Sequence, residues 1–169
     1  MLPASMSKRL MFVFAALFGI GQPAQALPPQ AGLTLPVSPT CVTSPFGPRR
    51  RIGQIAPGLH PGIDLSAPAG GAIRAAADGQ IAWVHKKGIG GLEMMIQHAD
   101  ASGSYATLYS HLGLLAPTIA EGKRHVVAGE KIAVVGRSGV TYGTHLYFGL
   151  LLNGRPIDPE PFLPVKRCD

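Results

Sequence analysis

The sequence predicts an all-β fold, a single antiparallel β-sheet domain of the sandwich or open-barrel type with little helix. From Cys41 onward, short runs of β-favouring residues alternate with clusters of Gly, Pro, Asp and Ser. No stretch shows an amphipathic helical period of useful length. The 22 glycines and 16 prolines suit many tight turns and oppose helices.

Six runs give the clearest strand signals, because each is rich in β-branched, aromatic or large apolar residues and is bounded by turn formers. They are Ala72 to Ala76, Gln80 to His85, Leu92 to His98, Tyr105 to Ser110, Lys131 to Val135 and His145 to Leu152. With no internal repeat between them, the 169-residue chain is long enough for one domain with a substantial core.

The N-terminus has the features of a secretory signal peptide over residues 1–26. Lys8 and Arg9 precede the apolar run Leu10 to Ile20, and Ala24-Gln25-Ala26 is a small-x-small cleavage signal. A retained membrane anchor is the alternative, but the apolar run is shorter than the roughly 20 residues that span a bilayer. We therefore expect an exported protein, periplasmic or extracellular, with no stable membrane anchor. Residues 27–40 form an extended, proline-rich lead-in, and residues 41–169 form the domain.

The two cysteines, Cys41 and Cys168, lie near the two ends of the predicted mature chain. An even cysteine count in an exported protein predicts a disulfide between them, with two free thiols as the alternative. Removal of residues 1–26 leaves 13 basic and nine acidic residues, a net charge of +4. This mild positive charge favours anionic surfaces such as cell-wall polymers. The only basic run, Arg49-Arg50-Arg51, is expected to be a solvated loop, and no nucleic-acid motif is present.

Three segments carry candidate metal-binding or catalytic histidines. His60 and Asp64 are spaced so that both face one side of an extended segment, and imidazole nitrogen and carboxylate oxygen are good zinc ligands. His111 follows the predicted strand Tyr105 to Ser110. In the last segment, His145 and Tyr147 point to the same face if it is a strand. Three other histidines are expected to be ordinary: His85 in a solvated turn, His98 structural at a strand end, and His125 in a polar loop.

From Val42 to Leu163 the chain resembles the peptidase domain of the lysostaphin/LytM-like zinc metalloendopeptidases. The matching segments occur in family order. They are Thr43 to Arg49, His60 to Pro68, Ala76 to Gly79, Ile96 to His98, Thr107 to Leu112, Gly136 to Gly139, Gly143 to Leu146 and Asn153 to Pro159.

The resemblance implies a hydrolase that cuts the peptide part of peptidoglycan with one zinc ion. It assigns His60 and Asp64 to two metal-ligand positions, and His111 and His145 to the histidines that assist the attacking water and the developing oxyanion. The third ligand position, normally a histidine, is occupied by Tyr147. A phenol binds metal well only after losing its proton. We therefore expect weakened zinc binding, or no bound zinc if Tyr147 does not act as a ligand. Recruitment of His145 to the metal, at the expense of its assisting role, is a further alternative.

Two functions follow from this substitution. The retention of four of the five expected site residues favours, by a narrow margin, a secreted zinc endopeptidase that acts on peptidoglycan crosslinks. The alternative is a catalytically inactive domain that binds peptidoglycan and activates another cell-wall hydrolase. A sugar-binding β-sandwich is a weaker third reading, because it leaves the His-Asp series unexplained.

Overall fold

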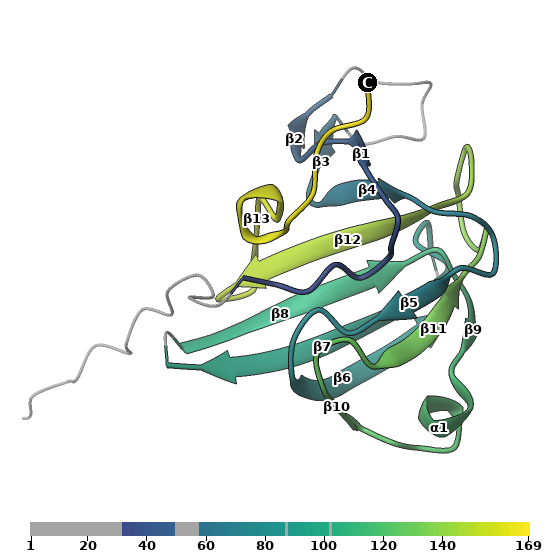
Figure 1. Ribbon diagram of the computed structural model, residues 1–169, viewed down its shortest axis with the longest axis vertical. Coiled ribbons are helices and arrows are strands. Elements are labelled where there is room, and N and C mark those ends of the chain that lie inside the picture. The colour runs from purple at the N-terminus through teal and green to yellow at the C-terminus, as the bar shows by residue number, and fades with distance from the viewer. Residues whose placement is uncertain (1–31, 50–57, 87, 102) are drawn as a thin grey trace, which may run out of the picture.

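The computed structural model describes residues 32–49, 58–86, 88–101 and 103–169, which form two packed antiparallel sheets and a small two-stranded ribbon (Figure 1). The large sheet has the strand order β1-β4-β12-β8-β7-β6-β10, with β13 paired to β12. Its strands are β1 (Val42–Ser44), β4 (Ile63–Ser66), β12 (His145–Leu152), β8 (Gly103–Ser110), β7 (Leu92–Asp100), β6 (Gly79–Lys86), β10 (His125–Val126) and β13 (Arg155–Ile157).

The second sheet has the order β5-β11-β9, with β5 (Ala72–Arg74), β11 (Lys131–Val135) and β9 (Leu112–Leu115). The ribbon pairs β2 (Gly47–Pro48) with β3 (Leu59–His60). Within the described residues, helix is limited to α1 (Pro117–Ala120) and the 3₁₀ turn η1 (Glu160–Phe162). The predicted all-β class is confirmed, and the sheets are not closed into a barrel.

All six runs predicted as strands contain one. The bounds of two runs, Lys131 to Val135 and His145 to Leu152, are exact, and those of the other four differ by one or two residues. The run 72–76 ends as a strand at Arg74, since Ala75 and Ala76 continue into the core without a ladder partner. The run 92–98 extends to Asp100, because the β7–β8 hairpin keeps its register to the Asp100–Gly103 pair.

The core lies between the two sheets. Alternate residues of β12, Leu146, Phe148 and Leu150, are fully buried there. They pack with residues of the small sheet such as Ile73 and Ile132. A buried hydrogen bond links the segment after β5 to β8, in which the backbone N–H of Ala76 donates to the Tyr109 hydroxyl over 2.9 Å.

The other side chains of the large sheet point away from this core, and we call this side the outer face. Two rows of side chains run across the strands there. The first row is polar and follows the pairing of Asp64 with Tyr147, Tyr147 with Ser110, and Glu93 with His85. In the middle of this row, the Ser110 hydroxyl on β8 donates to the Glu93 carboxylate on β7 over 2.6 Å. The second row is mostly apolar and contains Gly149, Leu108, Met95 and Trp83.

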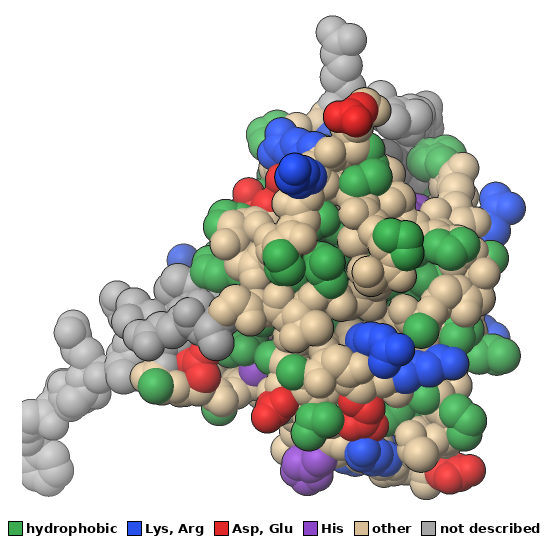
Figure 2. Space-filling view, in the orientation of Figure 1, with side chains coloured by type: hydrophobic (Ala, Val, Ile, Leu, Met, Phe, Trp, Pro, Cys, Tyr) green, Lys and Arg blue, Asp and Glu red, His purple; other side chains and the backbone are tan. Residues whose placement is uncertain are grey.

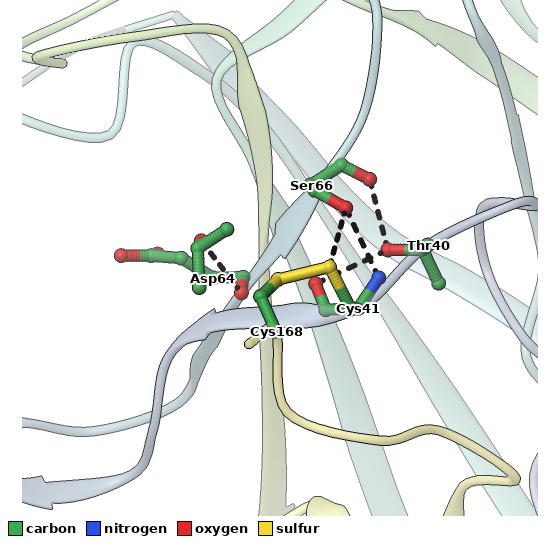
Figure 3. The surroundings of a disulfide bond; sticks show 6 residues. Thr40, Cys41, Asp64, Ser66 and Cys168 are labelled. Atoms are coloured by element: carbon green, nitrogen blue, oxygen red, sulfur yellow. Dashed lines mark hydrogen bonds between the residues drawn. A yellow bond between two sulfur atoms is a disulfide. The ribbon is translucent and has the colours of Figure 1, made fainter.

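The predicted Cys41–Cys168 disulfide is confirmed, and it closes one edge of the large sheet (Figure 3). The C-terminal segment runs beside β1, where Val42 exchanges backbone hydrogen bonds with Lys166 and Cys168. Ser66, the last residue of β4, accepts a hydrogen bond from Thr40 on its carbonyl and one from the Cys41 backbone N–H on its hydroxyl. The disulfide therefore restrains β1, the strand that pairs with β4, and β4 carries Asp64.

The predicted signal peptide, residues 1–26, and the first part of the lead-in lie outside the described residues. From residue 32 the lead-in is packed on the domain, with Leu33 and Val37 in the core. None of the helices in the described part of the chain is long and apolar enough to cross a membrane. On the face seen in Figure 2, acidic and basic side chains are interspersed rather than gathered into one patch of a single sign.

Candidate functional site

A groove of about 300 Å³ opens on the outer face of the large sheet. All five residues selected from the sequence line it, namely His60, Asp64, His111, His145 and Tyr147. They come from the ribbon, from β4, from the turn after β8, and from β12. The fold therefore brings together residues up to 87 positions apart, from His60 to Tyr147. The structure thus assembles one site from the five, while their individual roles stay predictions.

Asp64 lies at the centre of this site. One oxygen of its carboxylate, Oδ1, is 3.3 Å from His60 Nε2 and 3.5 Å from His145 Nε2. The pairing of β12 with β4 sets this geometry, because it places Tyr147 opposite Asp64 and His145 opposite Ser66. A single carboxylate oxygen therefore faces two imidazole nitrogens.

His60 is held rigidly, with a side chain only 2% exposed. Its Nδ1 lies 2.9 Å from the carbonyl oxygen of Pro45. Because a carbonyl only accepts, Nδ1 carries the hydrogen, and in the neutral ring Nε2 has a free lone pair directed at Asp64. A histidine that donates its other N–H to a carbonyl is the usual arrangement of a metal ligand.

His111 has a strained backbone and a similarly fixed ring. Its φ of 63° lies in the left-handed region, which is unusual for a residue with a side chain. Its backbone N–H donates to the Gly90 carbonyl, and its Nδ1 donates to the Ser138 carbonyl, both over 2.9 Å. The His111 ring meets the His145 ring edge to face, with 4.8 Å between centroids.

Two loops converge around His111 and form one wall of the groove. Ser138 bridges them, because its hydroxyl donates to the Leu112 carbonyl and accepts from the Leu92 backbone N–H. Gly91 and Gly139, both with positive φ, bring the two backbones into such close approach that neither position has room for a Cβ atom. Hydrogen bonds of Ser138 and the contact between the two glycines therefore hold the two loops together. The Ser138 carbonyl also orients the His111 ring.

Burial lowers the pKa of His145 below its ordinary value, and the neighbouring His111 lowers it further. The nearby Asp64 carboxylate opposes this change without cancelling it. His145 is accordingly neutral at neutral pH and has a lone pair available for a proton or an electrophile.

Tyr147 occupies the position where the resemblance leads us to expect a histidine ligand. Its ring centroid is 5.5 Å from that of His60, and its hydroxyl end rests against the sheet over Gly62 and Gly149. A Cβ atom on Gly62 would come within 2.8 Å of the hydroxyl oxygen, so only glycine leaves room for the ring. The ring thus leans toward the Gly149 end of β12 and away from the His145 end.

Burial is the largest influence on the Tyr147 hydroxyl and raises its pKa above the ordinary value of 10.0. The Asp64 and Glu93 carboxylates raise it further. The phenol is therefore protonated at neutral pH.

The residues present fit two positions of a zinc site and do not complete it. His60 and Asp64 are suitable donors, but a catalytic zinc usually has three protein ligands. In the described ranges, no three or more His, Cys, Asp or Glu side chains are grouped so that they could hold a metal ion. At the third ligand position of the family the donor would be the protonated, tilted phenol of Tyr147, so the assignment of Tyr147 as a ligand stays a prediction, as does the alternative recruitment of His145.

Arg49 corrects one sequence expectation, because it does not belong to a solvated loop. Its guanidinium Nη1 lies 3.7 Å from Asp64 Oδ2 and 3.3 Å from the Ser44 hydroxyl. Its Nε is buried and has no hydrogen-bond partner among the described residues. Arg50 and Arg51 lie outside those residues.

Sequence reasoning also missed the Ser110–Glu93 pair, which extends the polar row of the groove. The only available signal for Arg49 was its place at the end of the Thr43 to Arg49 segment, and no spacing pointed to Glu93.

An open antiparallel sheet whose outer face gathers three histidines around one carboxylate agrees with the metallopeptidase class that the sequence resemblance predicts. The sequence profile of Peptidase family M23 matches residues 58–159, and the chain belongs to this family. The resemblance to lysostaphin/LytM-like peptidases is confirmed, and the members of this family are zinc metalloenzymes that hydrolyse peptidoglycan.

Among the relatives, the DD-carboxypeptidase/endopeptidase Mpg of Neisseria meningitidis serogroup B is 40% identical over 124 residues, which are 73% of this chain and 27% of Mpg. The murein hydrolase activator NlpD of Salmonella dublin is 33% identical over 64% of this chain and 27% of NlpD. A zinc-containing peptidase from Vibrio cholerae has a similar structure, with a TM-score of 0.62 and 31% identity over 73% of this chain and 37% of that chain. The chain spans about a quarter of the length of these two curated relatives.

Proposed function

We propose that this protein is an exported domain that binds the peptide part of peptidoglycan in the groove and hydrolyses it weakly or not at all. The observation that carries the proposal is the position of Tyr147. Its ring rests on Gly62 and Gly149, so the third donor of the family's metal site is replaced by a protonated phenol that leans away from His145. A groove that keeps four of the five expected site residues but has an incomplete ligand set suits recognition better than hydrolysis.

The groove has the chemistry to recognise a short peptide. Arg49 offers a cation to a carboxylate, and Glu93 offers an acceptor to an amine or an amide. Ile89 and Val140 also line the groove and are exposed, so apolar side chains of a ligand can pack on them. A mostly apolar site with a few placed polar groups is typical of specific ligand binding.

A weakened zinc endopeptidase is the second candidate, and it was the narrow preference from the sequence. It is favoured by the orientation of His111, whose ring is fixed by Ser138 and contacts His145 at the edge of the groove. Such a constrained pair has no evident purpose in simple binding. A third candidate role is suggested by the relative NlpD, which is named a murein hydrolase activator. In this role the groove would bind and activate another cell-wall hydrolase.

The Tyr147→His variant separates these functions. We expect it to bind zinc more tightly than the natural protein, because a neutral imidazole completes a His-Asp-His set without the loss of a proton. Elemental analysis after dialysis against a mild chelator should find more zinc in the variant. Tyr142→His is the matched control, since it adds a histidine to the same groove on a loop rather than on β12.

Binding to purified peptidoglycan and release of soluble fragments should be measured on the same preparations. The proposal predicts that the natural protein sediments with peptidoglycan and releases little, whereas Tyr147→His releases more. A natural protein that already holds one tightly bound zinc and is active, with both lost in Tyr147→His, would show that Tyr147 is a true ligand and that the second candidate is right. A natural protein that does not bind peptidoglycan would overturn the proposal.

A further inference from the structure

We propose that the groove continues across the large sheet to a second subsite, formed by Trp83 and His85 on β6, which binds a sugar ring of the peptidoglycan glycan strand. The inference rests on the proposed function, because it extends the same groove to the carbohydrate part of the same polymer.

The first observation is the aromatic pair itself. The rings of Trp83 and His85 stack with 4.3 Å between centroids and 13° between planes. Trp83 is partly buried and His85 is exposed to solvent. This corrects the expectation that His85 lies in a turn, since it belongs to β6. A β-bulge between Ile81 and Trp83 shifts the register, so that Ile81 enters the core while Trp83 lies on the outer face.

The second observation is continuity with the groove. Trp83 ends the apolar row, in which Met95 and Leu108 separate it from Gly149. His85 ends the polar row, directly opposite Glu93. Leu108 and Glu93 already line the groove around Asp64, and Met95 is partly exposed beyond them. The apolar row and the polar row therefore run side by side from the histidine site to the aromatic pair.

The dimensions agree with a ligand that is peptide at one end and sugar at the other. From β4 to β6 there are four strand-to-strand steps, which amount to roughly 19 Å at about 4.8 Å each. An extended peptide covers that distance in about five or six residues. Peptidoglycan carries short peptides on its sugars, so a peptide held near Asp64 would bring its sugar to β6.

The side chains of the subsite suit a sugar ring better than a further peptide segment, because they combine a flat apolar surface with polar groups beside it. A pyranose ring has an apolar face of C–H groups, which packs on a flat aromatic ring, and a rim of hydroxyl and amide groups, which needs hydrogen-bond partners. Trp83 and Met95 provide the apolar surface, and His85 and Glu93 provide a donor or acceptor beside it. The occupant is therefore an amino-sugar ring of the glycan strand.

The test uses the fact that Trp83 is the only tryptophan of the chain. Addition of chitotetraose, a peptide-free oligomer of N-acetylglucosamine, should change the tryptophan fluorescence of the natural protein in a saturable manner. A matched titration with the peptides released from peptidoglycan by an amidase should change it little.

The Trp83→Ala variant should bind whole peptidoglycan about three- to tenfold more weakly, with unchanged affinity for the released peptides. Trp83→Phe should restore part of the affinity. His85→Ala removes the exposed ring of the pair and provides a second variant if Trp83→Ala does not fold. Leu114→Ala is the control, because Leu114 is 75% exposed on β9, away from the groove.

The outcomes distinguish this inference from the proposed function. If the natural protein binds peptidoglycan but Trp83→Ala and His85→Ala bind it equally well, the subsite is wrong and the proposed function stands. If the variants lose affinity for released peptides instead, the subsite holds peptide and the inference is overturned. If the natural protein binds neither peptidoglycan nor chitotetraose, both proposals fail.

Discussion

His60 and His111 share one hydrogen-bonding arrangement although they come from different parts of the chain. Each places Nδ1 2.9 Å from a backbone carbonyl, of Pro45 and of Ser138 respectively. Each carbonyl fixes which nitrogen carries the hydrogen, so both Nε2 atoms are directed toward the groove. Tyr147 breaks this pattern, because it rests on the glycines beneath it rather than presenting a lone pair.

His98 is a buried histidine outside the groove, and it provides a prediction about pH. Its side chain lies between the Asp78 carbonyl and the Thr107 hydroxyl, each 2.7 Å away, and stacks on Tyr105. Burial lowers its pKa below 6.5, and the hydrogen bond and charge of Asp78 only partly oppose this. The folded protein therefore takes up this proton at a lower pH than the unfolded chain does.

Because the unfolded chain binds the proton first, the contribution of His98 to stability is complete above pH 6.5 and is lost as the pH falls through and below that value. Urea unfolding from pH 7.5 to 5 should show a falling free energy of unfolding. His98→Gln should flatten this dependence while lowering stability at pH 7.5. An equally steep dependence in His98→Gln would assign the effect to other groups.

At the scale of elements, the two loops that Ser138 links by hydrogen bonds give a second prediction. Ser138→Ala removes a hydroxyl that joins the Leu92 N–H to the Leu112 carbonyl and leaves both without that partner. We expect a loss of stability of about 1–3 kcal/mol. Hydrogen exchange should report faster exchange of the Leu92 amide, together with weaker binding to peptidoglycan.

Ser104→Ala is the control for this variant, since Ser104 is an exposed serine on β8. An unchanged exchange rate of the Leu92 amide in Ser138→Ala would show that the loops are held by their glycine contact alone.

The strands were the most predictable elements, because runs such as Lys131 to Val135 combine β-branched residues with turn formers at both ends. The convergence of the five candidate residues on one groove was also predictable, since motifs in family order identify them, while their roles stay predictions. The positions of Arg49 and His85 were not predictable, because Arg49 depends on Asp64, which is 15 residues further along the chain, and His85 depends on a β-bulge that the sequence pattern does not mark. Arg49 turns inward toward Asp64, and a bulge in β6 carries Trp83 and His85 to the outer face.

At the scale of the whole molecule, the disulfide joins residues 127 positions apart and thereby restrains nearly the entire domain. In the chain-entropy model so long a loop contributes about 4–5 kcal/mol by restricting the unfolded chain. A Cys41→Ala/Cys168→Ala double variant should unfold at a clearly lower guanidinium concentration than the oxidised natural protein.

The reduced natural protein should behave like this double variant. Identical unfolding midpoints for the oxidised and reduced protein, with two free thiols verified by alkylation, would show that the bond contributes nothing to stability.

The close approach of Gly91 and Gly139 has a consequence for how this sequence can change over generations. Each position excludes a side chain because the other loop's backbone occupies the space, so a substitution at either one separates the two loops and widens the groove. A side chain becomes tolerable at one position only after the opposite loop has moved or lengthened. The two positions are therefore expected to be epistatic, and the width of the groove, with the range of ligands it admits, should diversify by paired changes rather than single ones.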